Sequence, residues 1–85
     1  MVHVTIYTRE FCGYCARALE TLAEKGADFT QIDAGIDVQL RQEMIARSGG
    51  GTTFPQIFVG DQHIGGCDDM LALDRAGKLD ALLNA

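Results

Sequence analysis

The chain is poor in several residue types, and each shortage narrows what the protein can be. Tryptophan is absent and proline occurs once among 85 residues. No apolar run approaches the roughly 18–20 residues that a membrane-spanning helix needs. The first residues also lack the basic start and apolar stretch of a signal peptide. We therefore expect a cytoplasmic protein that does not bind membranes.

Positive charge is also scarce. The chain has seven Lys and Arg residues and 12 Asp and Glu residues, which gives a formal net charge of -5. Contact with a phosphate backbone needs a basic patch, so this balance argues against nucleic-acid binding. The hydrophobic share of 47% and the charged share of 22% are ordinary for a folded chain and exclude intrinsic disorder. Length predicts a single domain spanning residues 1–85.

The cysteines are few and unevenly placed. Cys12 and Cys15 form a C-x-x-C pair, whereas Cys67 lies far along the chain. A secreted domain stapled by disulfides shows more cysteines, usually in an even number. In a reducing compartment such a pair is more often catalytic or metal-binding than structural. A zinc site completed by Cys67 and His63 is one alternative, and a plain packing role for the cysteines is another.

Hydrophobic periodicity predicts eight elements in the order β-α-β-α-β-β-α-α. The expected strands cover residues 2–8, 27–33, 56–59 and 62–65. The expected helices are one at 15–25 that stops at Gly26, one capped by Asp37 that ends at Ser48-Gly49, a short one capped by Asp68 or Asp69 that ends at Gly77, and a last one at 79–83. A strand–helix–strand start implies a parallel pair, and the later hairpin adds antiparallel strands. We predict an α/β fold: a four-stranded mixed sheet with helices on both faces.

The C-x-x-C pair falls where the first strand passes into the first helix. Free N–H groups and the positive dipole end at a helix start favour a thiolate at Cys12, and Arg9 adds a nearby positive charge. Cys15 follows one turn later, about 5–6 Å away by helix geometry, which suits a disulfide. We therefore predict that Cys12 attacks and that the more recessed Cys15 resolves.

Four segments resemble the glutaredoxin family, specifically its small bacterial dithiol members. They are Tyr7-Thr8-Arg9, Cys12-Gly13-Tyr14-Cys15, Thr53-Phe54-Pro55-Gln56-Ile57-Phe58 and Gly65-Gly66-Cys67-Asp68-Asp69. They occur in the family's order and span essentially the whole chain. The resemblance implies a thioredoxin-like fold and a glutathione-dependent oxidoreductase of cell redox homeostasis and electron transport. Its partners would be glutathione and glutathionylated or disulfide-containing client proteins, with the protein a monomer by default.

The resemblance further implies how glutathione is bound. Eight residues would contact it: Arg9, Tyr14, Thr53, Phe54, Pro55, Cys67, Asp68 and Asp69. Arg9, assisted by Arg41 or Gln42, would face the glycine carboxylate, and Tyr14 would flank the peptide. The backbone of Thr53-Phe54 would pair with the cysteinyl part, oriented by a cis Pro55.

The γ-glutamyl end of glutathione would reach the backbone of Cys67 and the carboxylate of Asp68, at a helix start. For Asp69 a helix-capping role without any ligand explains its position equally well. The Cys67 thiol itself is expected to pack beneath the groove as a small apolar group.

Two positions depart from the family pattern. Gly13 stands where proline is most frequent, and Phe54 stands where an aliphatic residue is usual. Glycine leaves the start of the helix less constrained and less crowded than proline does. In the family, variants without that proline include members that hold a [2Fe–2S] cluster between two subunits with two glutathiones. A cluster-bridged homodimer with Cys12 as ligand is therefore the alternative function, and the protein without a cluster is expected to bind no metal.

Overall fold

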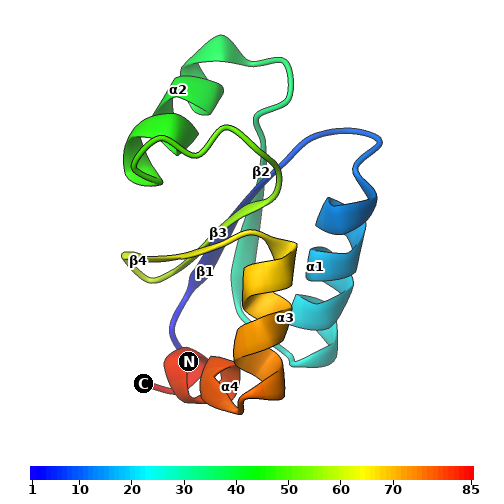
Figure 1. Ribbon diagram of the computed structural model, residues 1–85, viewed down its shortest axis with the longest axis vertical. Helices are drawn as coiled ribbons and strands as arrows, with labels where there is room; N and C mark the ends of the chain where they lie inside the picture. The colour runs from blue at the N-terminus through cyan, green and yellow to red at the C-terminus, as the bar shows by residue number, and fades with distance from the viewer.

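A central sheet of four strands organises the computed structural model, which describes residues 1–85 (Figure 1). The strands are β1 (Val4–Thr8), β2 (Phe29–Asp33), β3 (Gln56–Val59) and β4 (Gln62–Gly65). The helices are α1 (Gly13–Glu24), α2 (Val38–Arg47), α3 (Cys67–Arg75) and α4 (Lys78–Leu83). This order of elements is the one predicted from the hydrophobic pattern.

The sheet is mixed, with strand order β2-β1-β3-β4. β1 and β2 are parallel and are joined across one face by α1, whereas β3 pairs antiparallel with both β1 and β4. Helices α1 and α3 lie side by side on one face of the sheet, and α2 covers the other (Figure 1). The predicted thioredoxin-like arrangement is confirmed.

Two hydrophobic cores form because side chains alternate between the faces of each strand. Ile6 packs against α1, α3 and α4 in a cluster of 10 buried residues. Its neighbour Tyr7 points to the opposite face and joins Ala34, Met44 and Phe58 beneath α2. Burying each large apolar side chain stabilises the folded state by about 1.5–3 kcal/mol. The two cores hold both ends of the β1–α1 connection, which carries the C-x-x-C pair.

The strand and helix boundaries differ from the predicted ones by a few residues, for local reasons. β1 begins at Val4 because the Val2 N–H donates to the Leu83 carbonyl and so lies outside the sheet ladder. β2 begins at Phe29 because the Ala27 N–H still closes the turn after α1, donating to the Leu22 carbonyl. α1 begins at Gly13 rather than at residue 15, since Cys12 itself is the N-cap.

The predicted N-cap of α3 is wrong. Gly66 is the N-cap, and neither Asp68 nor Asp69 takes that position. Asp69 stands at the third helical position, and its carboxylate accepts the Gly66 N–H at 2.9 Å. The expected ends are confirmed at Gly26 and Gly77, which have φ of 65° and 73° that suit glycine. Every helix is too short or too polar to cross a membrane.

Candidate active site

The Cys12 sulfur occupies the N-terminus of α1. Cys12 has an extended backbone with φ −112° and ψ 105°, and its side chain accepts the Cys15 N–H at 3.2 Å. The same sulfur lies 3.9 Å from the carbonyl oxygen of Phe54. Cys12 is half-buried, and all three cysteines are free thiols. A helix N–H aimed at this sulfur stabilises negative charge on it, as expected for a cysteine at a helix start.

Cys15 is the recessed member of the pair. Its residue is only 3% exposed, as expected for a side chain pointing inward from α1. Burial, followed by the hydrogen bond to the Cys12 sulfur, raises the pKa of the Cys15 thiol to about 11. At neutral pH Cys15 therefore keeps its proton, and Cys12 is the sulfur that a substrate can reach.

This pKa shift predicts a loss of stability in alkaline solution. The pKa of Cys15 is 9.0 without perturbation and about 11 in the fold, so the folded state holds the proton more tightly between these values. The free energy of unfolding should be unaffected below pH 9 and should fall as pH rises from about 9 towards 11. Urea unfolding under reducing conditions at pH 8 and pH 10.5 measures the difference. Cys15→Ser should lose less stability across that interval than the wild type, and equal losses would contradict the assignment.

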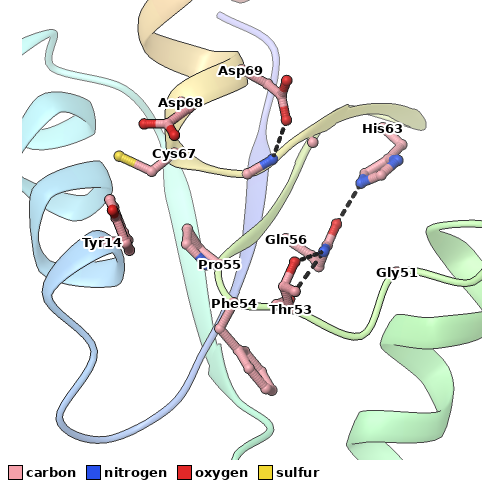
Figure 2. Close-up of a pocket in the computed structure, with 12 residues that line it drawn as sticks. Tyr14, Gly51, Thr53, Phe54, Pro55, Gln56, His63, Cys67, Asp68 and Asp69 are labelled. Carbon is pink, nitrogen blue, oxygen red and sulfur yellow. Dashed lines mark hydrogen bonds between the residues drawn. The ribbon is translucent and has the colours of Figure 1, made fainter.

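A groove of about 370 Å³ opens beside the pair (Figure 2). It runs between the start of α1, the loop before β3 and the turn from β4 into α3. Twelve residues line it: Tyr14, Gly51, Thr53, Phe54, Pro55, Gln56, His63, Gly65, Gly66, Cys67, Asp68 and Asp69. Seven of the eight residues expected to bind glutathione are among them, and the Phe54-Pro55 peptide is cis as expected.

The exception is Arg9, which the structure does not bring to this groove. Arg9 lines a separate depression with Phe11, Cys12 and Gln31, and its guanidinium donates to the Glu10 carbonyl at 3.4 Å. One cation beside the groove is Arg41, whose guanidinium carbon lies 5.7 Å from the centre of the Phe54 ring. Arg41 thus places a positive charge from α2 beside Phe54, whereas Arg9 places one beside the Cys12–Cys15 pair.

The other end of the groove is the start of α3. The backbone N–H groups of Cys67 and Asp68 belong to the first turn of α3, where amides have no acceptor within their own helix. The Asp68 carboxylate is exposed beside them, whereas that of Asp69 is engaged by Gly66. This end thus offers donors for a carboxylate and a negative charge for an ammonium group.

The structure separates the residues that a zinc site would need. His63 Nε2 lies 2.7 Å from Gln56 Oε1 rather than near a cysteine. No three or more His, Cys, Asp or Glu side chains are grouped to hold a metal. Cys67 is 3% exposed as a residue, and burial raises the pKa of its thiol. Its surroundings therefore fit a small packed side chain beneath the groove.

Sequence reasoning missed two features of this region. Gln56 is 5% exposed and donates to the Thr53 carbonyl oxygen at 2.9 Å. Its signal was a polar residue opening an otherwise apolar strand, β3. Phe11, next to Cys12 in the chain, is 99% exposed and has a left-handed φ of 54°. No sequence signal distinguished Phe11 from a buried aromatic residue.

Comparison with known proteins covers the whole chain. The profile of the glutaredoxin family matches residues 4–64. A glutaredoxin of Pseudomonas aeruginosa is 54% identical over 85 residues, which is 100% of both chains. Glutaredoxin 3 of Escherichia coli K12 is 53% identical over 83 residues, covering 98% of this chain and 99% of its own.

Solved structures are similar in fold as well as in sequence. The solution structure of a Brucella melitensis glutaredoxin is 60% identical with a TM-score of 0.83, covering 98% of this chain and 89% of that one. A buckwheat glutaredoxin in complex with glutathione is 28% identical with a TM-score of 0.84, covering 95% and 76%. A structure from work on metal binding of glutaredoxins is 59% identical with a TM-score of 0.72, and the match covers 98% of this chain and 89% of that one.

Proposed function

Because the chain belongs to the glutaredoxin family and is a glutathione-dependent thiol–disulfide oxidoreductase, we propose that Cys12 attacks and the twelve-residue groove holds glutathione. One observation carries the assignment. The half-buried Cys12 sulfur accepts a helix N–H and lies 3.9 Å from Phe54, which lines the groove. Residues 1–85 would act as one domain, by default a monomer in a reducing cytoplasm.

The proposed reaction is a pair of thiol–disulfide exchanges. The Cys12 thiolate attacks the glutathione sulfur of a mixed disulfide, the old S–S bond breaks, and the client leaves as a thiolate. A second glutathione thiolate then attacks the glutathione sulfur bonded to Cys12. That step forms glutathione disulfide and returns the Cys12 thiolate. The Cys15 N–H, aimed at the Cys12 sulfur, stabilises this thiolate both before attack and as the leaving group.

Protein disulfides would use both cysteines. Cys12 first forms a mixed disulfide with the client, and Cys15 then attacks the Cys12 sulfur to release the client as a thiolate. Two glutathiones reduce the resulting Cys12–Cys15 disulfide. The raised pKa of Cys15 means that it must lose its proton during this step. The attack of Cys15 on the Cys12 sulfur is therefore expected to be the slower step of the dithiol route.

Charge at the two ends of the groove would set the direction of glutathione. Its γ-glutamyl carboxylate would accept from the Cys67 and Asp68 N–H groups, and its ammonium would face the Asp68 carboxylate. Its glycine carboxylate would lie towards Arg41, which takes the part expected of Arg9. Asp69 would act indirectly by holding the Gly66 N–H. The glutathione complex of the buckwheat relative supports this use of the fold.

The direct test combines turnover with mapping of the bound peptide. The protein should release glutathione disulfide from a glutathionylated peptide when glutathione is supplied. Amide chemical shifts on titration with glutathione should move along Thr53–Pro55 and Cys67–Asp68. Shifts confined to the face of α2 or α4 away from the groove would refute the proposed binding site.

Gly13 favours a second candidate function, a [2Fe–2S] cluster held by two copies of the chain. A Cβ at position 13 would meet no atom within 4 Å beyond its chain neighbours, so the space beside the start of α1 is open. One chain groups no three metal-binding side chains, and four thiolates would have to come from Cys12 and glutathione in each of two copies. A relative studied for metal binding supports this possibility.

Gly13→Pro should reduce cluster uptake, because proline stiffens the loop and fills the open space beside Cys12. Anaerobic reconstitution with iron, sulfide and glutathione should give a coloured dimer for the wild type, seen by visible absorption and gel filtration. The variant should remain largely monomeric and colourless, with its thiol–disulfide exchange activity retained. Equal iron uptake by both proteins, or none by either, would remove Gly13 as the determinant.

A further inference from the structure

The buried amide of Gln56 joins the groove to β4. Its Nε2 donates to the Thr53 carbonyl oxygen at 2.9 Å and to the Thr53 hydroxyl at 3.2 Å. Its Oε1 lies 2.7 Å from Nε2 of His63. Figure 2 shows the three side chains in one line, His63 and Thr53 on opposite sides of Gln56. Each polar end of the Gln56 amide is thus committed to one partner.

These contacts fix which way the amide of Gln56 faces. A carbonyl oxygen can only accept, so the Gln56 NH₂ must face Thr53 and the Gln56 oxygen must face His63. His63 Nε2 is then the donor of that hydrogen bond. The imidazole is itself held by stacking on Phe58, with ring centres 4.9 Å apart and planes 34° apart.

The same contacts fix a peptide unit at the floor of the groove. The Thr53 carbonyl and the Phe54 N–H belong to one planar trans peptide, in which they point in opposite directions. Holding the Thr53 oxygen on Gln56 therefore turns the Phe54 N–H away from Gln56. That N–H donates to no group of the protein. It is therefore a backbone donor that a ligand in the groove can use.

Gly51, in the loop before β3, leaves room for the Gln56 amide. A Cβ built on Gly51 would lie 2.9 Å from Gln56 Nε2 and 2.6 Å from Ser48 Oγ. A side chain at position 51 would therefore force the Ser48 hydroxyl, the Gln56 amide or both to shift. The glycine that ends the 49–51 run thus has a steric reason to be there.

We propose that Gln56, held by His63, is a positioning residue for glutathione, because it fixes the Thr53–Phe54 peptide with the Phe54 N–H facing the bound tripeptide. The inference rests on the proposed function, since it assumes that glutathione pairs with this backbone. Gln56 touches neither reacting sulfur. Its loss should therefore weaken glutathione binding and leave the reactivity of Cys12 unchanged.

Gln56→Glu is the sharpest test, because it keeps the shape and the acceptor for His63 but removes the donor to Thr53. We expect the KM for glutathione to rise about fivefold with kcat within about twofold of the wild type. The rate of Cys12 alkylation by iodoacetamide should not change. Gln62→Glu is the matched control, since Gln62 is exposed on β4 and lies outside the groove. It should leave the KM unchanged.

His63, at the other end of this series of hydrogen bonds, gives a second test, and substituting it does not place a charge in the core. His63→Phe keeps a ring against Phe58 but loses the donor, and should raise the KM about twofold. His63→Gln supplies an amide donor close to the place of Nε2 and should restore the wild-type KM. If Gln56→Glu fails to fold, as far-ultraviolet circular dichroism would show, the contrast between these two variants decides.

Asp68→Ala, measured alongside, separates the role of Gln56 from the location of the glutathione site. A raised KM in Asp68→Ala and Gln56→Glu, with Gln62→Glu unchanged, supports the positioning role. A raised KM in Asp68→Ala alone overturns the role of Gln56 and leaves the groove in place. An unchanged KM in both variants overturns the groove as the glutathione site. A fall in kcat at unchanged KM in Gln56→Glu also overturns the positioning role.

Discussion

Replacing Cys12 with serine is expected to reduce glutathione-linked turnover of a glutathionylated substrate by about a thousandfold or more. The thiolate is the nucleophile in disulfide exchange, and a serine hydroxyl forms no S–S bond. The start of α1 would still be intact, because the serine oxygen can accept the Cys15 N–H in place of the sulfur. The loss would therefore be chemical rather than structural, and the thermal stability of the variant should stay close to that of the wild type.

Cys15→Ser is the matched control for this prediction. Deglutathionylation needs only Cys12 and a second glutathione, so the variant should keep its activity on a glutathionylated peptide. Its reduction of a protein disulfide should slow, because the mixed disulfide with the client loses its internal resolving thiol. A Cys12→Ser variant with full activity beside an inactive Cys15→Ser variant would reverse the assignment of the two thiols.

The position of the redox pair was predictable because it depends on local patterns. Alternating apolar residues in β1 and helical spacing in α1 place the Cys12–Cys15 segment at a strand-to-helix junction. Turn and cap residues such as Gly26 and Asp37 act on their immediate neighbours, so their roles could also be inferred from sequence. The glutathione assignment, in contrast, needed the resemblance to a family.

The parts of the site that sequence reasoning did not reach depend on packing between distant elements. Arg9 is close to Cys12 in sequence, yet Arg41 approaches the groove because α2 lies beside Phe54. The link from His63 through Gln56 to Thr53 needs the β3–β4 pairing before it exists. Gly66 is the N-cap of α3, and the Asp69 carboxylate reaches back across the turn to accept its N–H. None of these contacts has a periodic signature.

Removing the carboxylate of Asp68 gives the second large effect. Asp68 is the one exposed acidic group at the start of α3 that no protein donor engages, in contrast to Asp69. Asp68→Ala should raise the KM for glutathione about tenfold at low salt, since a charge-assisted hydrogen bond to the ammonium group is lost. The kcat should be nearly unchanged, because Asp68 touches neither reacting sulfur.

Salt separates a specific contact from a general change of charge. Glutathione carries a net negative charge, and the protein has a formal net charge of -5, so removing any acidic side chain weakens the overall repulsion. Asp61→Ala makes the same change in the exposed turn between β3 and β4, outside the groove, and should lower the KM slightly or leave it unchanged. Raising the salt from 20 mM to about 500 mM should weaken glutathione binding to the wild type more than to Asp68→Ala, because the screened ion pair is absent from the variant. Equal KM values for Asp68→Ala and Asp61→Ala at every salt concentration would show that the γ-glutamyl end of glutathione is held elsewhere.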